Sequence, residues 1–249
     1  MNFDHNAAPA DNPAFFTGLR PMLNRLASAL ATLLFAGLAQ AAPAADVQEL
    51  QRLAPNANPA ALQLALTAYH CASRSQSERL LTVIDYSRPS REKRLWVFDL
   101  AAHKLLFEEW VAHGKNSGAD VPTAFSNRPN SYQSSLGLFH TGQTYSGKHG
   151  RSLRLQGLEP GFNDNSEARA IVMHAAAYAD PGVVPGLGRL GRSQGCPAVR
   201  PAIAGQLIDT LRQGSYVFAY YPQPQWLEQS RYLNADSCPL TEQHLASKD

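Results

Sequence analysis

The stretch Gly191–Arg200 reads GRSQGCPAVR and can be interpreted in two ways, which require different local folds around it. Its first five letters fit G-x-S-x-G, the serine nucleophile elbow, with Ser193 as the attacking residue. Read from Ser193, the same stretch is S-x-G-C, which places the thiol of Cys196 directly after Gly195. The two interpretations require different surroundings, because an elbow needs a strand that runs into the serine and a helix that starts right after it.

The residues around Ser193 fit an elbow poorly. The preceding segment 180–192, DPGVVPGLGRLGR, carries prolines and repeated glycines, which a buried central strand does not tolerate. After the serine, Pro201 follows Pro197 closely, so the helix that an elbow needs begins too late. The downstream residues that would have to complete a serine triad are Asp209, Asp236 and His244. The last of these lies in the polar C-terminal tail, which makes the triad a poor one.

The cysteine interpretation needs a nucleophilic sulfur, a histidine that takes its proton, and donors for an oxyanion. His174 ends the apolar run AIVMH, so we expect its ring at the end of a rigid strand, facing Cys196. An adjacent imidazole would lower the pKa of the thiol. The amides of Gln194, Gly195 and Cys196 would form a concave array of donors. From the residues alone, this arrangement and a packed thiol with a satisfied histidine fit the pattern equally well.

The rest of the chain predicts mainly β structure with flanking helices, an α+β fold. β-branched and aromatic runs favour strands in the middle, and helical spacing of apolar residues favours helices on either side. The predicted helices are 46–52, 59–73, 201–212 and 226–233. The predicted strands are 80–87, 94–100, 105–114, 136–142, 151–158, 170–176 and 215–221. The predicted divisions are a helical segment at 42–79, a β-rich domain at 80–222 and a tail at 223–249.

The N-terminal residues 1–41 predict a cleavable signal peptide. Arg20 and Arg25 precede the apolar run Leu26–Leu38, and small residues follow as far as Ala41. The run is short for a membrane span, although an uncleaved anchor or a buried helix is the alternative. Met22 as the true start would give a compact signal. We therefore expect a periplasmic or secreted protein with no stable membrane association after cleavage.

The chain has three cysteines, and in an oxidising location outside the cytoplasm thiols tend to pair as disulfides. We expect Cys71, on a predicted helix, to pair with Cys238 in the tail and to leave Cys196 free; three buried thiols are the alternative. No C-x-x-C, H-E-x-x-H or close histidine pair predicts a metal site. A net charge of +2 and the lack of a basic run argue against nucleic-acid binding.

Two short motifs resemble those of a known family. SQGCPAV, preceded by IVMHAAAY, resembles the murein L,D-transpeptidase catalytic-domain family of the YkuD type, in its branch with an S-x-G-C-P signature. EKRLWVFDL, VAHGKNSG and SLRLQGLEPGFNDN extend the similarity over 80–221. The resemblance implies a β-sandwich or barrel catalytic domain, with Cys196 as nucleophile and His174 as base. It also implies that Ser193 and Gly195 shape the loop.

The chain departs from the wider superfamily, whose members mostly show S-H-G-C-[IV]-R. Gln194 takes the histidine position of that pattern and Ala198 the arginine position. Arg192 or Arg200 would replace the missing arginine in substrate binding, or that role is absent.

The resemblance implies a substrate and a reaction. The substrate is the stem tetrapeptide of peptidoglycan, cut between the L centre of a diamino acid and the terminal D-alanine. Cys196 would form a thioester that an amine of a second stem resolves, with no cofactor and no metal. Water as acceptor would give an L,D-carboxypeptidase or endopeptidase instead, and a peptidoglycan-binding module without catalysis is a further alternative.

For four other polar residues the sequence leaves the role open. His113 either lines the cleft, or orients the catalytic histidine, or bonds to nearby backbone in a turn. Tyr132 belongs to the polar run SNRPNSYQSSLG, which suits a glycopeptide or an ordered turn network. His140 and His149 lie in the same loop-rich region and receive no role.

Overall fold

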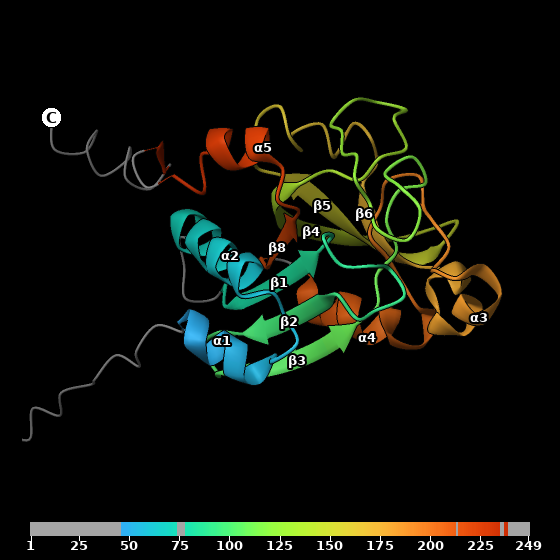
Figure 1. The fold of residues 1–249 in the computed structure, drawn as a ribbon, viewed down its shortest axis with the longest axis horizontal. Helices are drawn as coiled ribbons and strands as arrows, with labels where there is room; N and C mark the ends of the chain where they lie inside the picture. Colours follow the sequence, from blue (N-terminus) through green and yellow to red (C-terminus); the bar gives the residue numbers. More distant parts are fainter. Residues whose placement is uncertain (1–45, 74–77, 213, 235–236, 239–249) are drawn as a thin grey trace, which may run out of the picture. The chain divides into compact units, whose positions relative to one another are not determined.

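The structure is a computed structural model that describes residues 46–73, 78–212, 214–234 and 237–238 (Figure 1). These residues fall within one compact unit, Ala42–Asp249. The predicted signal peptide, at 1–41, lies outside the described residues. Within the described residues, no helix has the length and apolar character that a membrane span requires.

The described chain is built on one eight-stranded sheet in the order β3-β2-β1-β8-β4-β5-β6-β7. The strands are β1 Leu80–Asp85, β2 Leu95–Asp99, β3 Lys104–Glu109, β4 Gly137–Gly147, β5 Gly150–Gly157, β6 Val172–Ala175, β7 Ala198–Val199 and β8 Tyr216–Tyr220. Two neighbouring pairs, β1 with β8 and β6 with β7, are parallel, and the other pairs are antiparallel. The predicted mainly β fold with flanking helices is confirmed.

Helices cover this sheet from several sides (Figure 1). They are α1 Val47–Leu53, α2 Pro59–Ala72, α3 Val184–Leu187, α4 Pro201–Leu211 and α5 Pro224–Gln229, with two 3-10 turns at Ala177–Ala179 and Pro181–Val183. α2 begins at Asn58, whose side chain accepts the amide hydrogen of Ala60, and a proline at its first position suits the helical φ angle. Its buried face is rich in alanine, so α2 packs closely against β1 and β8.

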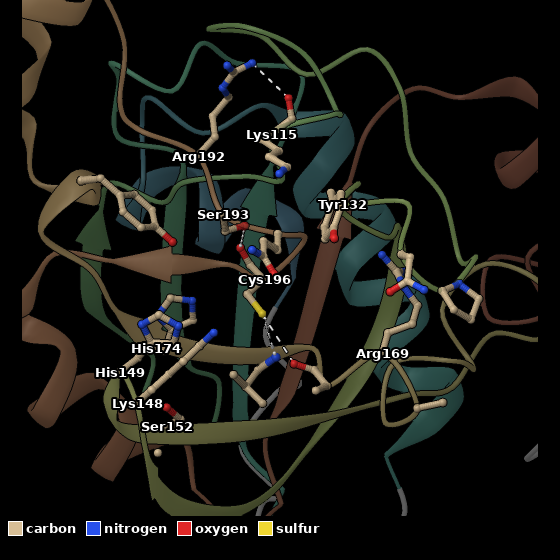
Figure 2. Close-up of a pocket in the computed structure, with 18 of the residues that line it drawn as sticks. Lys115, Tyr132, Lys148, His149, Ser152, Arg169, His174, Arg192, Ser193 and Cys196 are labelled. Carbon is tan, nitrogen blue, oxygen red and sulfur yellow. Dashed lines mark hydrogen bonds between the residues drawn. The ribbon is translucent and has the colours of Figure 1, made fainter.

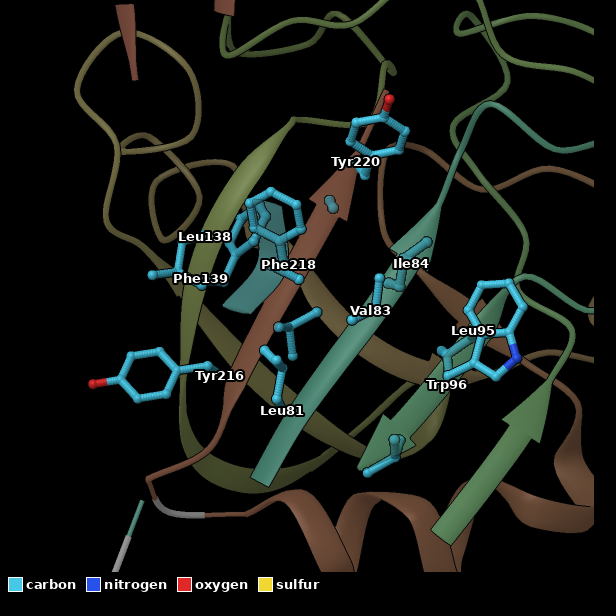
Figure 3. Close-up of a cluster of buried hydrophobic side chains, with 14 of the residues drawn as sticks. Leu81, Val83, Ile84, Leu95, Trp96, Leu138, Phe139, Tyr216, Phe218 and Tyr220 are labelled. Atoms are coloured by element: carbon cyan, nitrogen blue, oxygen red, sulfur yellow. The ribbon is translucent and has the colours of Figure 1, made fainter. Parts of the chain in front are cut away.

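The hydrophobic core lies where the strands are buried on both faces. β2 and β8 are buried at every position, which explains why their sequences are nearly continuous apolar runs (Figure 3). Phe218 of β8 packs against Trp226 of α5, with ring centroids 5.6 Å apart. The Trp226 indole also donates a 2.9 Å hydrogen bond to the buried carboxylate of Glu159. Residues of α1 and α2 belong to the same core cluster, so the N-terminal helices and the sheet form one hydrophobic core.

A disulfide joins Cys71, in the last turn of α2, to Cys238, with their Cα atoms 5.5 Å apart. Cys196 is the free cysteine. This is the pairing expected from the sequence, and it ties the C-terminal segment to the helix across a sequence separation of 167 residues.

The structure differs from the predicted elements around the sheet edge near Cys196. β4 runs on to Gly147 and forms a long hairpin with β5, whereas the sequence predicts a strand that ends at residue 142. The extra residues are partly or fully exposed and polar, so they lack the apolar alternation that marks a strand. The short strand β7 and the helical turns between 177 and 187 were not predicted, because segments of two to four residues carry too little periodicity.

Candidate active site

One strand pairing joins the segments that carry the nucleophile candidate and the base candidate. β6 carries His174, and β7 begins two residues after Cys196. The two strands are parallel, with His174 aligned to Ala198. This pairing brings together two residues that lie 22 positions apart in the sequence.

Both residues line a cleft of about 770 Å³ (Figure 2). The predicted site residues that it brings together are Cys196, His174, Ser193, Gln194, Arg192 and Tyr132. The cleft is large enough for a peptide of several residues, since small-molecule sites in proteins commonly span a few hundred Å³.

Ser193 is a structural residue of the loop. Its hydroxyl donates a 2.7 Å hydrogen bond to the carbonyl of Cys196 and accepts a 3.0 Å bond from the amide of Gly195. Its own amide donates to the carbonyl of His113 at 2.9 Å. The side chain is only 4% exposed. A hydroxyl that already closes the loop in this way is not available as a nucleophile, so the geometry favours the cysteine.

Gly195 is required by the backbone of the loop. Its φ is +125°, a conformation that L side chains rarely adopt. A Cβ added there would lie 2.9 Å from the carbonyl oxygen of Gln133. The Gly195 carbonyl accepts a hydrogen bond from the Ser134 hydroxyl at 3.1 Å, which fixes the peptide that precedes Cys196.

The set of oxyanion donors is smaller than the sequence predicts. The Gly195 amide is occupied by the Ser193 hydroxyl, so the prediction of a donor at this amide is wrong. The amides of Gln194 and Cys196 have no acceptor among the described residues. These two remain available to a negatively charged oxygen at the cleft.

The Cys196 sulfur is partly buried and held by backbone groups. The Val172 amide donates to the sulfur at 3.5 Å, and the sulfur donates to the Ala170 carbonyl at 3.6 Å. Burial raises the pKa of the Cys196 thiol above its ordinary 9.0, and the Val172 amide and the charges of Arg169 and Lys148 oppose that rise only in part. The net shift is thus opposite to the expected lowering of the thiol pKa by the imidazole, and it favours a neutral thiol at neutral pH.

His174 is held in the form of a neutral base. Its Nδ1 lies 2.9 Å from the carbonyl oxygen of Ala175. Because a carbonyl can only accept, Nδ1 carries the proton and Nε2 keeps its lone pair. Burial lowers the pKa of His174 below its ordinary 6.5, and the nearby charges of His149 and Lys148 lower it further, against the bond to Ala175. The pair is thus a neutral thiol and a neutral imidazole, which suits general-base catalysis.

Sequence reasoning missed the tip of the β4–β5 hairpin as part of the site. Lys148 and His149 form the two-residue turn between the paired residues Gly147 and Gly150, and both line the cleft. The His149 ring stacks on His174 with centroids 4.3 Å apart and an interplanar angle of 25°. No local pattern indicates this contact, although a lysine and a histidine in a glycine-flanked turn could have marked a hairpin tip.

Arg169 was also missed. Its guanidinium donates to the carbonyls of Ser126 and Gln133 at 2.7 and 2.6 Å, and to the hydroxyls of Ser135 and Ser131 at 2.5 and 3.1 Å. It forms a wall of the cleft, and its charge faces Cys196.

Two of the four predicted substrate-binding residues do not line the cleft. Arg200 forms a bidentate ion pair with Glu109, with donor–acceptor distances of 2.8 and 2.6 Å, so it does not replace the missing arginine of the signature. His113 is fully buried, and its Nδ1 accepts from Arg94 at 2.8 Å. Burial, together with the Arg94 charge, lowers the pKa of His113 to about 3. His113 neither lines the cleft nor touches His174; it supports the Cys196 loop through its carbonyl.

The two other substrate-binding candidates do line the cleft. Arg192 donates to the carbonyls of Lys115 and Gly118 at 3.0 and 2.8 Å. The Lys115 ammonium lies 4.2 Å from the centre of the Tyr132 ring. Among the described residues that line the cleft there are two lysines and two arginines but no aspartate or glutamate. The cleft is therefore suited to a substrate that carries carboxylates.

The described residues contain no cluster of three or more histidine, cysteine, aspartate or glutamate side chains that could hold a metal ion.

Comparison with known protein families identifies the family of this chain. The YkuD_2 family, described as the L,D-transpeptidase catalytic domain, matches residues 53–220. The chain therefore belongs to the L,D-transpeptidase catalytic-domain family, and the family predicted from its motifs is confirmed. No curated protein sequence matches the chain.

The solved structures to which the chain is similar include L,D-transpeptidases. An L,D-transpeptidase from Mycobacterium smegmatis is 15% identical, with a TM-score of 0.36, and the match covers 57% of this chain and 59% of that one. The L,D-transpeptidase from Xylanimonas cellulosilytica is 17% identical, with a TM-score of 0.36 and coverage of 59% and 63%. Bd1075 of Bdellovibrio bacteriovorus is 18% identical, with a TM-score of 0.39 and coverage of 68% and 58%. The chain thus spans less than two thirds of the length of these three structures.

Proposed function

We propose that this protein is a cysteine-dependent L,D-transpeptidase that acts on the stem tetrapeptides of peptidoglycan. The observation that carries the proposal is that Cys196 and His174, whose Nδ1 is held by the Ala175 carbonyl, line the same cationic cleft. Family membership supports the reaction type, and the excess of positive charge supports a peptide substrate with several carboxylates.

Acylation begins from the neutral pair. His174 Nε2 takes the thiol proton as the sulfur of Cys196 forms a bond to the carbonyl carbon at the L centre of the substrate. The amides of Gln194 and Cys196 hold the oxygen that becomes negative. The imidazolium then gives its proton to the departing amine as the C–N bond breaks. D-Alanine leaves, and a thioester remains on Cys196.

Deacylation repeats these proton transfers in reverse order. An amine of a second stem attacks the thioester, and His174 accepts the proton that the amine loses. When the C–S bond breaks, the proton returns to the sulfur and the neutral thiol is restored. With water in place of the amine, the same residues would release a tripeptide.

A carbapenem tests the identity of the nucleophile. Ring opening of the β-lactam by the thiol of Cys196 adds the whole mass of the compound to the protein, and intact-mass spectrometry measures this gain. We expect Cys196→Ala to give no adduct and Ser193→Ala to keep it, more slowly because the loop loses two hydrogen bonds. An adduct that survives in Cys196→Ala would refute the cysteine mechanism.

The products test the reaction. Incubation with defined tetrapeptide muropeptides should yield cross-linked dimers and free D-alanine, which mass spectrometry resolves. Release of D-alanine and tripeptide without dimers would identify a hydrolase. If no muropeptide gave a product, the remaining interpretation would be a peptidoglycan-binding module without catalysis.

We also propose that the chain acts outside the cytoplasm, as a 42–249 protein in which the helical segment and the tail flank the 80–222 catalytic domain. The Cys71–Cys238 disulfide supports this location, because disulfides persist in oxidising compartments. N-terminal sequencing of protein exported by a bacterial host should begin near Ala42. A chain that keeps its first residues and stays in the cytoplasm would contradict the proposal.

A further inference from the structure

The β4–β5 hairpin places a cation beside the proposed base. Lys148 and His149 are the two turn residues of this hairpin, and both are exposed along the cleft. Stacking of His149 on His174 fixes the tip of the hairpin next to the imidazole. Figure 2 shows the Lys148 side chain beside the two imidazoles, with its nitrogen directed into the cleft towards Cys196.

Lys148 differs from the other cations of the cleft in being unpaired. Arg169 uses its guanidinium on four groups of the wall, and Arg192 binds two carbonyls. The Lys115 ammonium lies over the ring of Tyr132. Among the described residues, the Lys148 ammonium has no hydrogen-bond or ion-pair partner. It is therefore the cation most able to take a ligand without losing an existing contact.

The proposed reaction determines which group of the substrate lies there. The leaving amine must lie within hydrogen-bond reach of His174, because the imidazole gives it a proton. In D-alanine, the terminal carboxylate is attached to the carbon that carries this amine. That carboxylate must therefore lie close to the imidazole, in the part of the cleft that the hairpin tip also lines.

We propose, on the basis of the function proposed above, that Lys148 binds the terminal carboxylate of the departing D-alanine, with His149 positioning the turn that carries it. The attacking amine of the second stem belongs to the D centre of a diamino acid, which also carries a carboxylate. Because acceptor and leaving group occupy the same place, Lys148 binds the carboxylate of either one.

The test compares acids with amides, because only the acid carries the charge that Lys148 binds. Two donors are used, a tetrapeptide that ends in D-alanine and the same peptide that ends in D-alaninamide. Acceptors are D-methionine and D-methioninamide. The variants are Lys148→Met, which keeps the length of the side chain, Lys148→Arg, which keeps the charge, and Lys104→Met, a matched control at an exposed lysine of β3.

The measured quantity is the ratio of kcat/KM for the acid to kcat/KM for the amide. Any change in the ionisation of Cys196 or His174 affects both substrates and cancels in this ratio. We expect wild type, Lys148→Arg and Lys104→Met to prefer the acid by about tenfold, equivalent to ~1.4 kcal/mol. Lys148→Met should lower the preference to roughly one, for donors and acceptors alike.

The possible outcomes distinguish failure of the Lys148 subsite, meaning the proposed binding of the carboxylate by Lys148, from failure of the proposed reaction. A wild-type protein that uses acid and amide equally, or a Lys148→Met variant that keeps the preference, would overturn the subsite and leave the transpeptidase function standing. A wild-type protein that processes neither donor would overturn both. Equal rates of Cys196 alkylation by iodoacetamide in wild type, Lys148→Arg and Lys104→Met, which all keep a cation at the hairpin tip, together with unchanged urea unfolding of Lys148→Met, would show that the site is intact.

Discussion

Replacement of Gly195 by alanine tests whether the strained loop is required for the site. The φ of +125° at this position is one that glycine adopts freely, whereas an alanine there costs about 1–3 kcal/mol of backbone strain. The new Cβ would also lie 2.9 Å from the Gln133 carbonyl oxygen and 3.1 Å from Cδ1 of Ile171, so the neighbours must shift. We expect Gly195→Ala to lower the free energy of unfolding by roughly 2–4 kcal/mol.

Gly205 provides a matched control for the same chemical change. It lies in the interior of α4, and a Cβ added there meets no atom within 4 Å. Alanine in an exposed helix is favoured over glycine by about 0.5–1 kcal/mol, so Gly205→Ala should raise the free energy of unfolding. The two substitutions add the same methyl group and should act with opposite signs.

Urea unfolding followed by tryptophan fluorescence measures both variants, and carbapenem acylation measures the site. Gly195→Ala should also slow acylation, because the displaced peptide carries the Cys196 amide. Gly205→Ala should leave the acylation rate unchanged. A Gly195→Ala variant as stable as wild type, or one that acylates at the wild-type rate, would refute the reasoning that the loop conformation builds the site.

Three further predictions follow from the fold and the charges. Replacing Cys71 and Cys238 together by alanine should lower the free energy of unfolding by up to about 5 kcal/mol, since the disulfide closes a loop of 167 residues; a loss below 1 kcal/mol in urea unfolding would contradict this. The rate of carbapenem acylation should be level across neutral pH, because the active neutral pair exists between the lowered pKa of His174 and the raised pKa of Cys196. The acylation rate should fall below pH 6.5, where the imidazole is protonated, and above pH 9.0, where the sulfur has no proton to pass to His174. An acylation rate that already falls above pH 6.5 on the acid side would contradict this prediction. Arg200→Met should lower the free energy of unfolding by about 1–3 kcal/mol, because it leaves the buried Glu109 carboxylate unpaired. The acylation rate should stay within twofold of wild type. A large loss of acylation with normal stability would show that Arg200 acts in the site after all.

Much of the fold was predictable because its signals are local. Buried strands such as β1 and β8 show as apolar runs rich in β-branched and aromatic residues, and α2 shows as helical spacing after an asparagine cap and a proline. The long β4–β5 hairpin was not predictable, because its outer half is held by backbone pairing between exposed residues. Such pairing leaves no hydrophobic pattern in the sequence.

By itself, the sequence determined the family, the mainly β fold with flanking helices, and Cys196 and His174 as the candidate nucleophile and base. It did so because those properties are carried by short motifs and by the period of apolar residues. The tertiary structure alone decided which residues line the cleft beside Cys196. Lys148 and His149 line it, whereas Arg200 pairs with Glu109 and His113 is buried in the interior. The tertiary structure also decided the upward direction of the Cys196 pKa shift, since burial depends on contacts between residues far apart in the chain.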